Sequence, residues 1–217
     1  MTLNEIIYRI KETFTRYNVN DDSKPSDSLL INQTNSGRAT LIRRDLDQNI
    51  NMNQYIFQSY KIEFEKVDSF EDCDINSDCF ILRSVEEIPQ AVRLKDGEAI
   101  FIYAMDTSTP LTRISFDRAN YISYQRYTKN QYYWFTRNNR IYIIGPKFIQ
   151  FLKLRMIFTN PLDAKVLCCE CVENKCLTPD DAYPFPDDMV DQLEAYLFST
   201  IYKNLIPSNT INDNNAK

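Results

Sequence analysis

The sequence predicts an α+β fold with two N-terminal helices, a central antiparallel β region and one C-terminal helix. Apolar residues recur at helical spacing within residues 1–50 and again within residues 186–206. Between residues 55 and 160 the period shortens to the alternation of half-buried strands. Helices segregated from strands along the chain are typical of α+β proteins. We therefore interpret residues 1–206 as a single domain and residues 207–217, which are polar, as a flexible C-terminal segment.

The first two helices carry local signals of their own. Thr2 and Glu5 form a T-x-x-E capping box, and the helix that follows should end at the polar stretch of residues 18–25, which we expect to be mobile. A second helix is expected over residues 26–47. Gly37 within it costs about 1 kcal/mol relative to alanine, so we expect a close approach of another helix or another chain there.

The β region is expected to begin with a strand at residues 60–65. The further strands are expected at residues 80–82, 91–94, 99–105, 132–136, 140–144 and 150–158. Gly97 marks a hairpin turn into the strand at 99–105. Asn138 and Asn139 mark a second hairpin, because asparagine tolerates the positive φ of tight turns.

The last helix should follow Pro186, which suits the first helical position. Asp187 and Asp188 favour the positive end of its dipole. Its apolar stripe continues to Leu205, and the helix should end before Pro207.

Composition excludes several classes of protein. The chain has 217 residues, 43% of them hydrophobic, which is enough for one sizeable core. It contains no histidine, so catalytic pairs and metal ligands that use histidine are absent, and its three glycines form no phosphate-binding loop. No apolar run approaches the roughly 18 residues of a membrane span, and no secretory segment is evident at the start. We expect a non-enzymatic protein without cofactor, made in a cytoplasm.

Cysteines are concentrated in one stretch, VLCCECVENKC, which begins at Val166. Cys168 and Cys171 form one C-x-x-C pair, whereas Cys73 and Cys79 are too far apart to make a good second pair. A structural zinc, a redox centre and late disulfides are all open, but thiols without chemistry in a loop are the simplest interpretation. No metal ligand is therefore assigned.

Charge is segregated along the chain. Residues 1–50 have no net charge, residues 51–112 carry −7, residues 113–155 carry +8 and residues 156–217 carry −6. The basic segment of residues 113–155 also contains many aromatic residues. Its cations include the four arginines that we expect at a protein interface: Arg118, Arg126, Arg137 and Arg140.

Three interpretations of the basic segment compete. It can be an ordinary hairpin with core aromatics on one side and solvated cations on the other. It can dock on an acidic face of a neighbouring chain. It can also bind single-stranded nucleic acid by base stacking and phosphate neutralisation, although the net charge of −5 counts against a dedicated binder.

Several stretches, in order along residues 1–206, resemble the neck and tail ring proteins of crAss-like bacteriophages. They are TLNEIIYRIKE, SLLINQTNSGRATLIRRDLDQN, FILRSVEEIPQAVRLKDGEAI, SFDRANYIS, RNNRIYII, LRMIFTNP and YPFPDDMVDQLEAYLF. Each stretch is weak alone, because none is a catalytic signature, but their common order supports the resemblance.

The resemblance implies a structural virion protein of the head-to-tail connector, with an adaptor-like fold. Such proteins assemble into homo-oligomeric rings, commonly dodecamers, that contact the portal protein and other ring or tail proteins around the DNA channel. No catalytic residue and no role for the cysteines is carried over. The alternative functions are a single-stranded nucleic-acid-binding module that uses residues 113–155, and a zinc-stabilised accessory protein.

Overall fold

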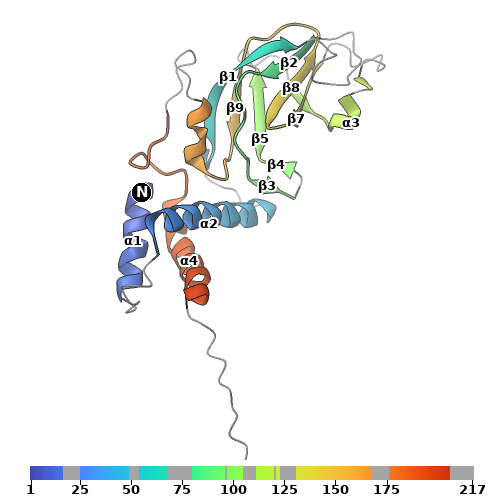
Figure 1. Cartoon of the computed structure of the whole chain (residues 1–217). Helices are drawn as coiled ribbons and strands as arrows, with labels where there is room; N and C mark the ends of the chain where they lie inside the picture. The colour runs from blue at the N-terminus through green and yellow to red at the C-terminus, as the bar shows by residue number, and fades with distance from the viewer. Residues whose placement is uncertain are drawn as a thin grey trace, which may run out of the picture. The chain divides into compact units, whose positions relative to one another are not determined.

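The computed structural model describes residues 1–16, 25–48, 54–67, 80–95, 97–104, 111–119, 121–122, 131–167 and 176–205. The chain divides into two compact units (Figure 1). The helical unit comprises Met1–Asn53 with Pro179–Lys217, and the β unit comprises Gln54–Thr178. The α+β class and the order of helices and strands are therefore confirmed. The interpretation of residues 1–206 as one domain stays a prediction, and the segments expected to be mobile lie almost wholly outside the described residues.

The helical unit contains α1 (Leu3–Arg16), α2 (Asp27–Asp47) and α4 (Val190–Leu205). The capping box of α1 is confirmed by reciprocal bonds, since Thr2 N–H donates to Glu5 Oε2 at 2.8 Å and Glu5 N–H donates to Thr2 Oγ1 at 3.1 Å. Ser26 caps α2 by accepting from the Leu29 N–H. Pro186 precedes the 3₁₀ turn η6 (Asp187–Met189) that leads into α4, so it lies one residue earlier than expected.

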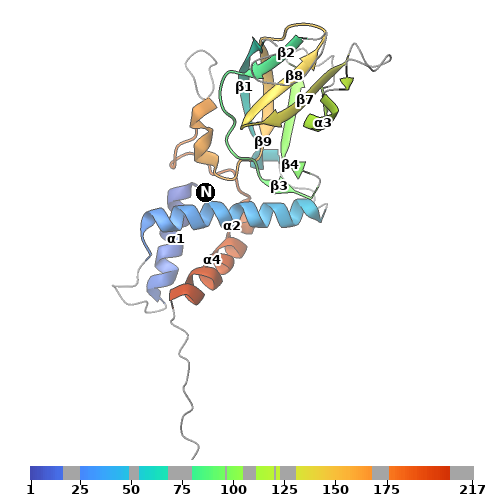
Figure 2. The same cartoon turned by 45° about the vertical axis from the view of Figure 1, so that its right-hand side comes forward.

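The close approach expected at Gly37 is confirmed, and the partner is another helix of the same chain. A Cβ at Gly37 would lie 2.8 Å from Leu193 Cδ1 and 3.1 Å from Tyr196 Cδ1, both on α4. In Figure 2, α2 runs across α4. Glycine therefore leaves room on α2 for the side chains of Leu193 and Tyr196.

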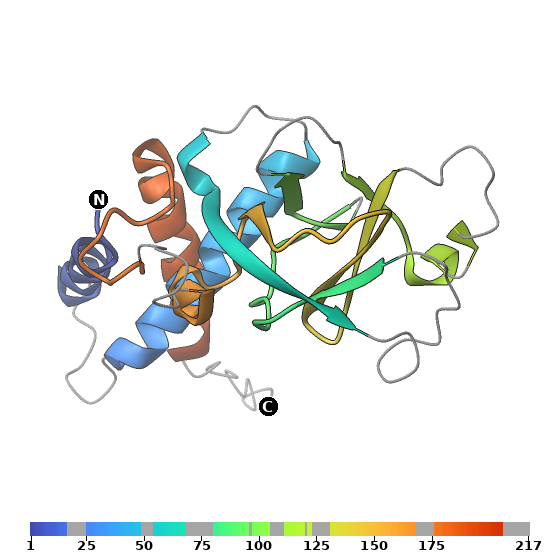
Figure 3. The ribbon, with the colours of Figure 1, turned by 90° about the horizontal axis from the view of Figure 1, so that it is seen from above.

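The β unit is built on a seven-stranded sheet in the order β5-β9-β1-β2-β8-β7-β6. Its strands are β1 (Gln58–Val67), β2 (Phe80–Ser84), β5 (Ile100–Ala104), β6 (Leu111–Arg113), β7 (Tyr132–Arg137), β8 (Arg140–Gly145) and β9 (Phe151–Met156). Figure 3 shows β1 as a long curved strand of this sheet. All neighbours are antiparallel except β6 and β7, which are parallel.

Two parts of the sheet differ from expectation. The hairpin around Gly97 is only the two-residue pair β3 (Arg93–Leu94) and β4 (Gly97–Glu98), and β5 pairs with β9 instead. The strand β6 was not expected, and neither was its parallel pairing. A parallel pair requires a crossover connection, which residues 114–131 supply, with the short helix α3 (Phe116–Ala119) inside it.

The hairpin of β7 and β8 is confirmed. Asn138 and Asn139 have φ values of 50° and 58°, and Arg137 pairs with Arg140 across the turn. Positive φ at both central residues matches the twist of the flanking strands, which is why asparagine is favoured there.

Opposite edges of the sheet come together, so that the sheet curls around a core. Arg113 on β6 donates from Nη1 to the carbonyl oxygen of Glu98 at 3.0 Å, and Glu98 stands two residues before β5. The inner faces of six strands share one hydrophobic cluster, which Ala164 and Leu167 of the 3₁₀ turn η4 (Pro161–Leu167) also join. The short turn η2 (Gln54–Ile56) precedes β1.

Candidate functional site

The aromatic residues of β7 are buried on both faces of the sheet. Tyr132 and Trp134 belong to the inner core, whereas Tyr133 and Phe135 belong to a second cluster on the outer face. The expectation of core aromatics on one side only is therefore wrong for this strand. Buried rings cannot stack on bases, so the nucleic-acid interpretation loses four of its aromatics; Tyr121 is 66% exposed, and Tyr124 and Tyr127 lie outside the described residues.

The second cluster lies between the sheet and the crossover connection. Ala119 and Ile122 of residues 114–122 pack against Phe135, which is 1% exposed. Phe135 stacks on Tyr142 of β8, with centroids 5.3 Å apart and an interplanar angle of 7°. Residues 114–122 thus cover the outer face of β2, β8 and β7.

The expected interface arginines have different roles in the structure. Arg140 donates from Nη1 to the carbonyl oxygens of Ser84 and Val85, at 2.9 and 2.6 Å, so it tethers the chain after β2. Arg137 lies over the ring of Phe116, with Cζ 4.5 Å from its centroid. Arg118 is exposed on α3. Arg126 lies outside the described residues, so the structure does not bring the four together.

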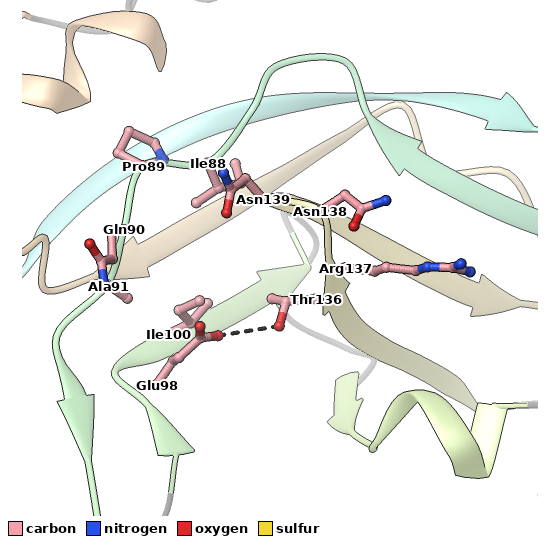
Figure 4. A pocket seen from close by; sticks show the side chains of 10 residues that line it. All are labelled: Ile88, Pro89, Gln90, Ala91, Glu98, Ile100, Thr136, Arg137, Asn138 and Asn139. Carbon is pink, nitrogen blue, oxygen red and sulfur yellow. Dashed lines mark hydrogen bonds between the residues drawn. The ribbon is translucent and has the colours of Figure 1, made fainter. Parts of the chain in front are cut away.

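A pocket of about 210 Å³ opens beside the Asn138–Asn139 turn (Figure 4). Its walls are residues 88–91, the end of β7 and the start of β5. The Glu98 carboxylate inside it accepts from Thr136 Oγ1 at 3.2 Å, and its Oε2 lies 3.5 Å from Arg113 Nη2. Thr136 and Arg113 are both residues of the sheet. Glu98 therefore helps to hold the two edges of the curled sheet together.

The outer face of β5, β9 and β1 has a different character. We call it the cation–aromatic face and define it by six residues that alternate with the inner core: Phe57, Lys61, Phe101, Phe151, Lys153 and Arg155. Lys61 Nζ lies 4.3 Å from the centroid of Phe151, and Arg155 Cζ lies 4.4 Å from that of Phe57. Phe57 also meets Phe101 edge to face, at 5.8 Å. Cations over aromatic faces are held in place by the ring quadrupole.

The alternation of residues 150–158 predicts a strand, and it also carries the sequence signal for this face. In FLKLRM, which is β9, every second residue from Phe151 is aromatic or basic. Pairing with β1 and β5 brings Lys61 opposite Lys153 and Phe101 opposite Arg155. That grouping depends on strand order, which the sequence alone does not reveal.

The helical unit holds one buried polar network. Arg38 is fully buried and donates from Nε to the Pro184 carbonyl at 2.8 Å, with Cζ 5.6 Å from the Tyr183 centroid. Tyr183 donates from its hydroxyl to Asn35 Oδ1 at 2.6 Å. Burial raises the pKa of Tyr183 to about 12, with Arg38 opposing, and burial lowers the pKa of Arg38 below its ordinary value. The network joins the chain before α4 to α2.

Of the six cysteines, only Cys176 belongs to the described residues, and it is exposed. Within the described ranges, no group of three or more histidine, cysteine, aspartate or glutamate side chains is placed to hold a metal. The zinc interpretation concerns Cys73, Cys79 and residues 168–171, which lie outside them. Among the helices that the structure describes, none combines the length and apolar character of a membrane span.

Comparison with protein families identifies the family of this chain. Residues 5–217 match the family of phage tail ring protein 2, from crAss-like phages. The chain belongs to this family. The resemblance to crAss-like phage ring proteins is thereby confirmed, and no curated protein matches the chain.

Family membership makes this ring protein a structural component of a phage tail, located in the virion. A ring is built from several subunits, so the surfaces described above are candidates for contact with other virion tail proteins. The covered outer face is occupied by the ring protein's own residues 114–122. Of these two parts of the outer face, the cation–aromatic face is therefore the more available for contact with another protein.

Proposed function

We propose that this protein forms a homo-oligomeric ring in the neck of the virion, joins the portal to the tail and surrounds the DNA channel. The match to the phage tail ring family over residues 5–217 is the observation that carries this proposal. The neck position, the portal as partner and a twelvefold ring come from the resemblance to connector proteins. The subunits are made in the host cytoplasm, and the ring has no catalytic role.

Charge segregation supports a head-to-tail arrangement. A ring needs two different, complementary surfaces on each subunit, because heterologous interfaces close into rings. Residues 113–155 carry +8, and the flanking segments carry −7 and −6. A subunit that carries both kinds of surface can pair with its own copies.

Genome DNA passes through the channel without specific binding. The net charge of −5 repels phosphates at long range, and the aromatics of β7 are buried in the core. The four aromatic residues of β7 are therefore not open to base stacking.

The four basic-segment arginines remain candidates for subunit contact. Arg118 is the clearest test, because Arg140 already binds two backbone carbonyls of its own subunit. Arg118→Glu should weaken assembly without altering the fold. Arg140→Glu would disturb the β unit itself, so it does not report on docking alone.

Light scattering of the purified protein over a range of concentrations, with negative-stain imaging, tests the proposed ring. We expect closed rings with a mass that corresponds to about twelve subunits. A monomer at every concentration, in the presence and absence of the portal protein, would overturn the proposal. Bound zinc that is lost together with folding on chelation would instead support the zinc-stabilised accessory protein.

A further inference from the structure

We propose that the cation–aromatic face of β5, β9 and β1 docks the acidic start of the last helix of a second copy of this chain. The inference rests on the proposed homo-oligomeric ring and names one of its interfaces. The acidic patch comprises the exposed Asp180, Asp187, Asp188 and Asp191.

Exposure is the first observation. Phe101 is a large aromatic residue on an edge strand, and 43% of its surface is exposed. The inner residues of the same strands are buried in the core, so the alternation leaves this face without a hydrophobic cluster of described residues over it. An aromatic group rimmed by charge is the usual composition of an interaction surface.

Charge is the second observation. Lys153 is exposed, Arg155 is half-buried, and neither is within ion-pair distance of a carboxylate among the described residues. Arg155 is held over Phe57, so its guanidinium is positioned before any partner arrives. Pre-positioned cations lose less conformational entropy on binding, which favours docking of a carboxylate.

The same chain supplies the complementary surface. Residues 156–217 carry −6, and Asp187 and Asp188 stand in the turn η6 that leads into α4. Asp187 contacts the Met1 amino group and Asp191 contacts Arg9, but Asp188 is exposed and has no such cation among the described residues. A basic face on one unit and an acidic patch on the other give the two unlike surfaces that a ring requires.

Nucleic acid fits this face less well than an acidic protein surface. The rings of Phe57 and Phe151 are already covered by Arg155 and Lys61, so they are not open to base stacking. A carboxylate of the acidic patch binds the cations themselves and needs no open ring.

The test compares charge reversal on this face with reversal elsewhere in the β unit. Lys153→Glu with Arg155→Glu should raise the dissociation constant of assembly by about 100-fold, because like charges then face each other across the interface. Lys147→Glu with Lys165→Glu makes the same change in net charge at two exposed positions outside the face, and should change assembly by less than about threefold. Circular dichroism and thermal unfolding check that both variants fold.

A mixing experiment identifies the occupant. The variant Asp188→Lys should also assemble poorly, and mixing it with the Lys153→Glu, Arg155→Glu variant should restore association between unlike copies. Recovery would depend on protein concentration. Two defective variants that stay apart when mixed would overturn the assignment of the acidic patch as the partner.

Three further outcomes would contradict the proposal, and each identifies which part of it is wrong. If the wild-type protein never self-associates, the proposed ring fails and this interface fails with it. If the wild type assembles and the Lys153→Glu, Arg155→Glu variant assembles equally well, only the interface is wrong. If that variant assembles normally but loses binding to a labelled single-stranded oligonucleotide, the face binds nucleic acid instead.

Discussion

The outer face of the sheet has two halves, and both are formed by strands of alternating inward and outward residues. The two halves differ in burial, because one is covered and the other is exposed. Over β2, β8 and β7, the outward residues are apolar and are buried beneath residues 114–122. Over β5, β9 and β1, they include cations, aromatic residues and the carboxylate of Glu63, and they are partly or fully exposed. The difference shows that the subunit covers one half of this face with its own chain and leaves the other half exposed, where we propose that a second copy docks.

The largest expected effect on stability is in the covered half of the outer face, over β2, β8 and β7. Phe135→Ala should lower the free energy of unfolding of the β unit by about 3–5 kcal/mol, because it removes a fully buried ring and its stacking on Tyr142. The matched change Phe101→Ala should cost less than about 1 kcal/mol, since that ring is exposed. Urea unfolding followed by tryptophan fluorescence measures both, because the single tryptophan, Trp134, lies in the β-unit core. Equal losses would contradict the comparison.

The helical unit provides an independent reference for such measurements. The pKa of Tyr183 is raised to about 12, so between pH 10 and 12 the unfolded chain releases this proton more readily than the folded one. Stability should therefore fall as the pH rises through that window, by up to about 2–3 kcal/mol. Helical circular dichroism during urea titration should report the loss.

Tyr183→Phe is the control for this effect. It should flatten that part of the pH dependence, while at neutral pH it should cost about 1–2 kcal/mol because Asn35 loses its hydroxyl partner. A pH dependence between 10 and 12 that is unchanged in this variant would assign the effect to other groups.

Removing one ring from the segment that covers the second cluster should have a smaller effect on the free energy of unfolding. Phe116 packs against Phe135 with centroids 5.6 Å apart and lies beneath Arg137. Phe116→Ala should cost about 1–2 kcal/mol, because the ring is only partly buried, and should expose part of the second cluster. Binding of a hydrophobic dye would report that exposure, and an unchanged signal would show that residues 114–122 stay in place without it.

The smallest expected effect is on the uncovered half. Arg155→Gln removes one cation from the ring of Phe57 and should change the free energy of unfolding by less than about 1 kcal/mol. Thermal unfolding of this variant beside the wild type is sufficient to check it. A loss of several kcal/mol would mean that the cation–aromatic face stabilises the subunit itself.

Local features of the fold could be predicted from the sequence because short-range chemistry determines them. The reciprocal bonds of Thr2 and Glu5 and the positive φ of Asn138 and Asn139 each depend on a few neighbouring residues. Gly37 indicates a close approach because of its own position inside a helix, although the sequence does not say which element approaches it. Each can therefore be predicted without the strand order.

Long-range features could not be predicted in this way. The parallel pairing of β6 with β7 depends on the path of residues 114–131, and the grouping of Lys61 with Lys153 depends on β1 lying beside β9. The charge of Arg140 predicts an interface, but its position places it against the carbonyls of Ser84 and Val85. Sequence charge alone does not distinguish a tether inside a subunit from a contact between subunits.

The discontinuous helical unit has a consequence for the order of events during synthesis. Gly37 and Arg38 on α2 meet their partners only in Pro179–Lys217, which is translated after the whole of Gln54–Thr178. At about 5–20 residues per second, the ribosome needs roughly 6–25 s to produce that intervening stretch. During this interval α1 and α2 lack their packing partner, and the acidic start of α4 does not yet exist. If copies join through that patch, as we propose, nascent chains cannot do so before Pro179–Lys217 is being made, so translation itself delays this contact.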